Sequence, residues 1–147
     1  MKTLLVPVDF SAVSGKVIET ALALARAFQS RVTLLHVIQP PVVGTGDYAL
    51  PSDVVEQAMK TTRLDTQRKL NALGDVFQQA GIEFAVADAI GSPERAILEH
   101  IAKTDADCVI MGSHGHGKLY DFLVGSTASG VIKHTKCAVL IVPPADK

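Results

Sequence analysis

Apolar side chains gather in five short segments of the 147-residue chain, and a longer mixed segment separates each from the next. Four of the five are nearly unbroken runs of Val, Ile and Leu, which is typical of strands that are covered on both faces. The remaining one, residues 82–90, alternates more and is predicted to be an edge strand. The five predicted strands are residues 3–8, 31–38, 82–90, 107–111 and 137–142.

The segment between the first two strands has a helical pattern, because its apolar residues recur at steps of three and four. This spacing predicts a helix over residues 11–29. The residues expected on its inner face are Val13, Val17, Ala21, Leu24 and Phe28.

The second and third predicted helices are marked by their first residues. The second begins at residue 52 or 53, where Asp53 followed by Glu56 resembles a capping box, and it ends before the glycine at position 81. The third begins after Ser92, a hydroxyl residue suited to the N-cap, with Pro93 at the first helical position. A proline is tolerated there because its missing N–H would have no partner within the helix.

A fourth helix is predicted to begin at residues 125–126, where Ser126 can act as the cap. Ala128, Val131 and Ile132 are expected to point inward. Basic residues between positions 133 and 136 place positive charge near the helix C-terminus, where the helix dipole favours it.

Strands and helices thus alternate along the whole chain, which predicts an α/β fold. We expect a single Rossmann-like domain over residues 1–147, with a parallel five-stranded sheet between two layers of helices. Ligands of such sheets bind outside the carboxyl ends of the strands, where the strand order reverses. Asp9, directly after the first strand, lies at that edge. The long segment 39–51 is predicted to be a mobile loop.

Composition excludes several classes of function. The chain has 14 Lys and Arg against 15 Asp and Glu, so no field of one sign attracts nucleic acid or an anionic membrane. No apolar run approaches the roughly 20 residues that span a bilayer. We therefore expect a cytoplasmic protein that binds neither nucleic acid nor membrane. Its two cysteines are too far apart in sequence for a CxxC redox or zinc site.

The stretch from Gly112 to Thr127 carries the candidate chemistry, and two of its readings are weak. Residues 112–118 satisfy the first seven positions of a Walker phosphate loop, but Leu119 occupies the position of the hydroxyl that binds Mg²⁺. His114 and His116 could both ligate a metal, yet a zinc site needs three or four protein ligands and no nearby cluster completes the set.

A third reading uses the whole stretch as one nucleotide clamp. Gly112 and Gly115 let the backbone approach a ligand closely, because neither has a Cβ. After nine further residues the chain reaches Gly125 and Ser126, where the N–H groups of a helix start suit a polyphosphate. The spacing is then Gly-x2-Gly-x9-Gly-Ser.

This spacing resembles the ATP-binding signature of the universal stress protein family. The resemblance extends over almost the whole chain, since LLVPVDFS, LLHVI, GSP, MGSHG and CAVLIVPP follow in that order. It implies a sheet of strand order 3-2-1-4-5, of the adenine-nucleotide α-hydrolase type, and a homodimer formed through the last strand. The one departure is an added histidine and glycine within the variable nine residues.

The resemblance also implies a set of site residues for ATP, or for ADP or AMP, with Mg²⁺ or Mn²⁺. Asp9 is the candidate metal ligand, although an acid at this place can instead interact with the first helix. The implied nucleotide-binding residues are Pro7, Val8, Asp9 and Val37 near the adenine, Met111 lining the pocket, Gly112 at the ribose, and Gly115, Gly125, Ser126 and Thr127 at the phosphates.

The resulting functional hypothesis is a stress-response switch whose nucleotide occupancy alters a surface that a regulatory protein partner reads. At most slow hydrolysis is expected, because residues 112–125 contain no Glu or Gln to position water. The alternative is a nucleotide-independent dimeric interaction protein. For either, the apolar strand from Cys137 to Val142 would be a hazard as an open edge, so we expect it to pair with a second copy.

Overall fold

The computed structural model describes residues 1–40, 50–113 and 124–144. Strands and helices alternate through these ranges, as the sequence pattern predicts. In chain order the elements are β1 (Thr3–Pro7), α1 (Ser14–Phe28), β2 (Arg31–Ile38), α2 (Ser52–Gln79), β3 (Phe84–Ile90), α3 (Pro93–Thr104), β4 (Cys108–Gly112), α4 (Ser126–His134) and β5 (Ala138–Val142).

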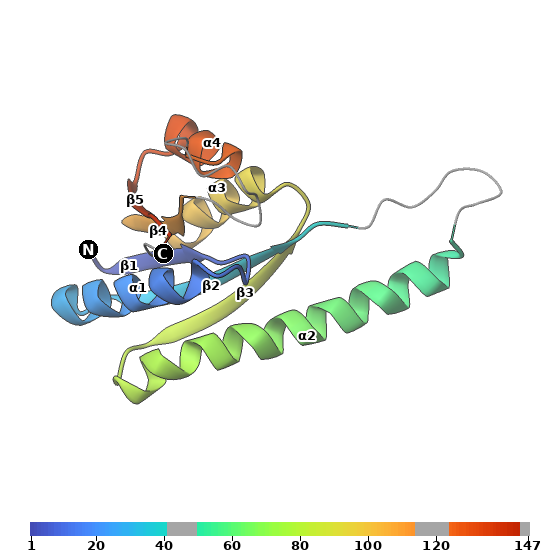
Figure 1. Ribbon diagram of the computed structural model, residues 1–147, viewed down its shortest axis with the longest axis horizontal. Helices are drawn as coiled ribbons and strands as arrows, with labels where there is room; N and C mark the ends of the chain where they lie inside the picture. Colours follow the sequence, from blue (N-terminus) through green and yellow to red (C-terminus); the bar gives the residue numbers. More distant parts are fainter. Residues whose placement is uncertain (41–49, 114–123, 145–147) are drawn as a thin grey trace.

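The strands form one five-stranded sheet of order β3-β2-β1-β4-β5, in which every pairing is parallel. Helices α1 and α2 cover one face of the sheet and α3 and α4 cover the other (Figure 1). This confirms the predicted fold class, the strand order and the position of β3 at an edge. The strand order reverses at β1, which lies between β2 and β4.

The central strand β1 contributes to the cores on both faces. Leu4 and Val6 pack in the cluster that contains α1 and α2, whereas Leu5 packs in the cluster that contains α3 and α4. All three side chains are fully buried. Burial on both faces explains why the central strands are continuous apolar runs in the sequence.

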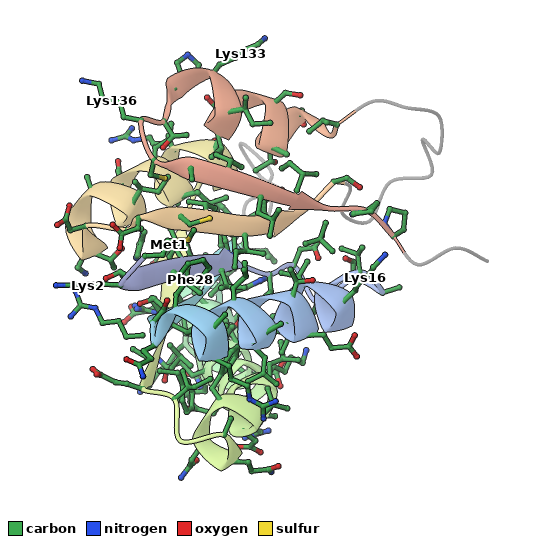
Figure 2. All side chains as sticks on the ribbon, turned by 90° about the vertical axis from the view of Figure 1, so that its left-hand side faces the viewer. Met1, Lys2, Lys16, Phe28, Lys133 and Lys136 are labelled. Atoms are coloured by element: carbon green, nitrogen blue, oxygen red, sulfur yellow. The ribbon has the colours of Figure 1, made fainter. Side chains whose placement is uncertain are left out.

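The inner face of α1 was predicted correctly at its start and incorrectly at its end. The helix begins at Ser14 rather than at residue 11, and Val17 and Ala21 are buried as expected. Phe28, however, is 49% exposed at the end of α1 where Lys2 also lies (Figure 2). Ala25 is buried in its place, because the inner face continues through Ala21 and Ala25 at a step of four.

Three predicted capping interactions are absent from the described residues. Helix α2 has Pro51 at its N-cap with no side-chain cap, so the capping box from Asp53 is wrong. Ser92 does occupy the N-cap of α3, but its hydroxyl makes no capping bond. Ser126 is the first residue of α4 rather than its cap, which is Gly125.

Helix α4 buries Ala128 and Val131 as predicted, but Ile132 is 46% exposed. The predicted basic C-terminus is present, and Lys133 and Lys136 extend outward at the end of this helix (Figure 2).

Helix α2 is longer than the sheet it covers. Its 28 residues span about 42 Å, and its buried residues all lie between Thr66 and Phe77. The N-terminal half extends past the sheet (Figure 1). Despite this length, none of the helices in the described ranges is apolar enough to cross a membrane.

Candidate functional site

A cavity of about 690 Å³ opens at the carboxyl edge of the sheet, where the strand order reverses. The pairing pattern explains the opening. Strands β1 and β4 pair only through Leu4–Cys108 and Leu5–Val109, whereas β1 keeps five paired positions with β2. Beyond Leu5 the two central strands are not paired, and residues from both strand ends, Pro7 of β1 and Met111 of β4, line the cavity.

Nine of the ten sequence-predicted binding residues line this cavity. The tenth, Gly115, lies outside the described residues, as do His114, His116 and Lys118. The nine come from four separate parts of the chain, namely residues 7–9, residue 37, residues 111–112 and the start of α4. They are Pro7, Val8, Asp9, Val37, Met111, Gly112, Gly125, Ser126 and Thr127.

The N-terminus of α4 forms the wall that suits an anion. Gly125, Ser126 and Thr127 line the cavity, and no side chain of the described residues caps the helix. The first N–H groups of a helix have no partner within it, and with the helix dipole they attract negative charge. The Gly125 N–H donates to the Ser113 carbonyl at 2.7 Å, so the two ends of the intervening segment meet at the cavity.

Asp9 organises the turn between β1 and α1. Its Oδ1 accepts a hydrogen bond from the Ser11 backbone N–H at 3.0 Å and one from the Ser14 hydroxyl at 3.3 Å. The structure therefore shows that Asp9 interacts with the start of the first helix, since Ser14 is the first residue of α1. The hydroxyl oxygen of Ser11 is buried and has no hydrogen-bond partner within the described ranges.

His36, which lies within the apolar run of β2, also lines the cavity. Its Nδ1 lies 2.8 Å from the Val8 carbonyl oxygen. Because that oxygen can only accept, Nδ1 carries the proton. The ring packs on Phe10, with ring centroids 4.4 Å apart.

Ten other lining residues were not predicted as site residues, and tertiary packing brings most of them to this edge. They are Val13, Ser14, Val17, Leu35, His36, Gln39, Pro93, Ile97, Ser113 and Ala128. The α3 start at Ser92-Pro93 could have signalled one of them, since it follows the carboxyl end of a strand.

Charge in the cavity is sparse. Apart from His36, Asp9 is the one ionisable residue among the described lining residues. No group of three or more His, Cys, Asp or Glu side chains that could hold a metal occurs in the described part of the chain. Among the described lining residues, the groups suited to a polyanion are the backbone N–H groups at the start of α4 and the hydroxyls of Ser126 and Thr127.

The universal stress protein family model matches residues 1–143. The chain belongs to the universal stress protein family. Among curated relatives, this universal stress protein is 30% identical to universal stress protein MJ0577 of Methanocaldococcus jannaschii, over 96% of this chain and 94% of the relative. It is 27% identical to universal stress protein YxiE of Bacillus subtilis, over 95% and 97% of the two chains.

Solved structures share the fold. The structure of hypothetical protein MJ0577 superposes with a TM-score of 0.85 at 24% identity, covering 99% of this chain and 98% of that one. A universal stress protein in complex with cAMP superposes with a TM-score of 0.69 at 21% identity, and 98% of each chain is covered. One from Archaeoglobus fulgidus in complex with dAMP gives a TM-score of 0.61 at 19% identity, covering 96% and 97%.

Proposed function

We propose that this universal stress protein binds an adenine nucleotide, ATP or its products ADP and AMP, in the cavity between β1 and β4. The observation that carries the proposal is the meeting of nine predicted residues from distant parts of the chain on one cavity. Its volume of about 690 Å³ lies within the range of roughly 300–1,000 Å³ that is usual for small-molecule sites. The cAMP and dAMP complexes of two fold neighbours support adenine as the base.

The lining residues suggest how the nucleotide would be divided among them. Apolar Val37 and Met111 suit the adenine ring, together with the backbone of residues 7–9. Gly112, which lacks a side chain, suits the ribose. The uncapped start of α4 and the hydroxyls of Ser126 and Thr127 suit the phosphates.

We further propose that a divalent cation, Mg²⁺ or Mn²⁺, accompanies the nucleotide and that Asp9 helps to hold it. Asp9 is the one carboxylate among the described lining residues, and it follows β1 at the edge of the sheet where the cavity opens. Both cations prefer oxygen ligands, which the Asp9 carboxylate and the phosphates supply. The buried Ser11 hydroxyl, which has no hydrogen-bond partner among the described residues, adds an oxygen at the same turn. When bound, the cation would neutralise phosphate charge.

The biological role that follows is a nucleotide-dependent regulator in the stress response, with at most slow hydrolysis. Occupancy of the cavity would alter the surface around the start of α4, and a protein partner would read that surface. Residues 112–125 include no Glu or Gln to position an attacking water, which argues against fast turnover.

We also propose that two copies pair through β5, the edge strand of the sheet. Leu140 is 37% exposed on this strand, and the neighbouring Ala138 is exposed as well. An apolar open edge favours pairing with another strand. Sedimentation of Leu140→Lys should show a monomer where the wild type is a dimer. A variant that stays dimeric would reject this edge as the interface.

Calorimetric titration with Mg-ATP tests the binding site. Ser126→Ala should weaken binding about ten- to a hundredfold, because hydrogen bonds to a charged group contribute roughly 1.5–3 kcal/mol. Gly125→Val should abolish binding by placing a side chain in the wall of the cavity. Ser52→Ala is the matched control, because Ser52 is the exposed first residue of α2 and lies outside the cavity. Tight binding that survives both site substitutions would remove the assigned site.

A further inference from the structure

The backbone of Phe10 has a conformation that bulky residues rarely adopt. Its φ is +59°, in the left-handed region. Two other non-glycine residues in the described ranges have positive φ, Gln29 and Asp105, and each is the C-cap of a helix, where this conformation is common. Phe10 has no such explanation. It lies instead in the turn between β1 and α1, directly after the cavity residue Asp9.

Contacts from two other elements hold the Phe10 ring in place. It packs on the His36 ring of β2 with centroids 4.4 Å apart and an interplanar angle of 34°. From α2, the Lys69 Nζ lies 5.6 Å from the centroid of the Phe10 ring. His36 is itself fixed, because its Nδ1–H donates to the Val8 carbonyl at 2.8 Å.

The three residues from Val8 to Phe10 are therefore constrained on both sides of Asp9. Before it, the Val8 carbonyl is tied to His36. After it, the left-handed Phe10 turns the chain so that the Ser11 N–H reaches back to Asp9 Oδ1 at 3.0 Å. Strained backbone of this kind persists only where the surroundings impose it, and it concentrates at binding sites.

We propose that Phe10 is a positioning residue of the cavity, which orients the Asp9 carboxylate through the packing of its ring on His36. Its function toward nucleotide rests on the binding proposed above, but the orientation itself does not. The Phe10 ring keeps the turn after β1 in its left-handed conformation, and this turn orients the Asp9 carboxylate through the hydrogen bond from the Ser11 N–H. Loss of the ring should let the backbone relax to negative φ and carry the carboxylate away from its present place.

Amide hydrogen exchange of the nucleotide-free protein tests the orientation directly, with Ser11 as the reporter. In Phe10→Ala the Ser11 amide should exchange about tenfold faster than in the wild type, while amides in the middle of α1 keep their rates. Phe10→Asn should retain most of the protection, because Asn tolerates the left-handed region without a ring. Phe28→Ala, which removes an exposed ring, is the control and should change nothing. Unchanged Ser11 exchange in Phe10→Ala would overturn the proposal.

A double-mutant cycle then tests the consequence for the ligand. Phe10→Ala and Asp9→Asn should each weaken Mg-ATP binding, and Phe10→Ala should add nothing in the Asp9→Asn background. Additive losses would show that Phe10 acts elsewhere and would overturn its positioning role. A wild type that binds no nucleotide would remove the proposed function, whereas the exchange experiment would still decide the role of Phe10.

Discussion

Two glycines inside helices, Gly74 of α2 and Gly130 of α4, should respond in opposite ways to replacement by alanine. Both are buried, and both lack room for a Cβ. At Gly74 the new methyl would overlap the aromatic ring of Phe84. At Gly130 it would overlap the carboxylate of Glu94, the far end of a flexible side chain.

The ability of each neighbour to move sets the expected change in stability. Alanine gains about 1 kcal/mol over glycine inside a helix. Phe84 packs against the core and against Phe77, at 6.2 Å between ring centroids, so moving its ring away from α2 would cost these contacts. Overpacking of this kind costs about 1–3 kcal/mol. Gly74→Ala should therefore lower the free energy of unfolding by about 1 kcal/mol.

Glu94, in contrast, is partly exposed and can rotate into solvent. Rotation breaks its pair with His134, whose Nδ1 lies 3.0 Å from the carboxylate. Exposed pairs contribute about 0.2–1 kcal/mol, less than or equal to the helix gain. Gly130→Ala should thus be neutral or stabilising by up to about 0.8 kcal/mol.

Urea denaturation followed by circular dichroism measures both variants on one scale. The two unfolding free energies should differ by about 1–2 kcal/mol, with similar m values, and Gly130→Ala should be the more stable variant. Equal stabilities, or a more stable Gly74→Ala, would show that Phe84 yields easily and would refute the reasoning about the rigid ring.

Two further substitutions test how the sheet is held together. Hydrogen bonds from the backbone N–H groups of Thr3 and Lys2 hold the pKa of the Asp107 carboxyl below its ordinary value of 3.8. The ionised carboxylate therefore stabilises the folded protein fully above pH 3.8, and this stabilisation is lost as the pH falls through the folded-state pKa. The destabilisation of Asp107→Asn, measured by thermal melts from pH 7 to pH 2, should shrink on the acid side, and a constant difference would contradict it. Arg63→Ala should lower the free energy of unfolding in urea by about 1–2 kcal/mol, because it breaks a 2.8 Å ion pair with the nearly buried Asp88 carboxylate. An unchanged free energy of unfolding would mean that this ion pair does not stabilise the fold.

Much of the fold could be predicted because its physical causes are local or periodic. Burial on both faces makes the central strands continuous apolar runs, and the alternation of strands with helices leaves few arrangements of the sheet. The starts of α2, α3 and α4 agree with the sequence prediction, whereas the start of α1 does not. Helix α1 begins at Ser14 rather than at residue 11 because Asp9 and the left-handed Phe10 organise a turn that no propensity reveals.

Exposure of single residues was the other weak point. Phe28 and Ile132 fit a helical spacing, yet both are exposed, whereas Ala25 and Val131 on the same two helices are buried. Periodicity alone does not decide which of two neighbouring positions packs on the core. It also does not reveal that the N-terminal half of α2 extends past the strands.

The candidate site could be predicted in its outline, because the residues after parallel strands meet at one edge. The partners of those residues could not. His36 fits a core strand by pattern, and only the structure shows that it binds the Val8 carbonyl beside the cavity. The contact of Ser14 with Asp9 likewise depends on where α1 begins.

Native mass spectrometry of the freshly purified protein, before and after addition of Mg-ATP, tests the central claim most directly. The account predicts a mass increase of one adenine nucleotide per chain for the wild type and none for Gly125→Val. A wild type that carries no nucleotide when purified and gains none with Mg-ATP in excess would contradict it.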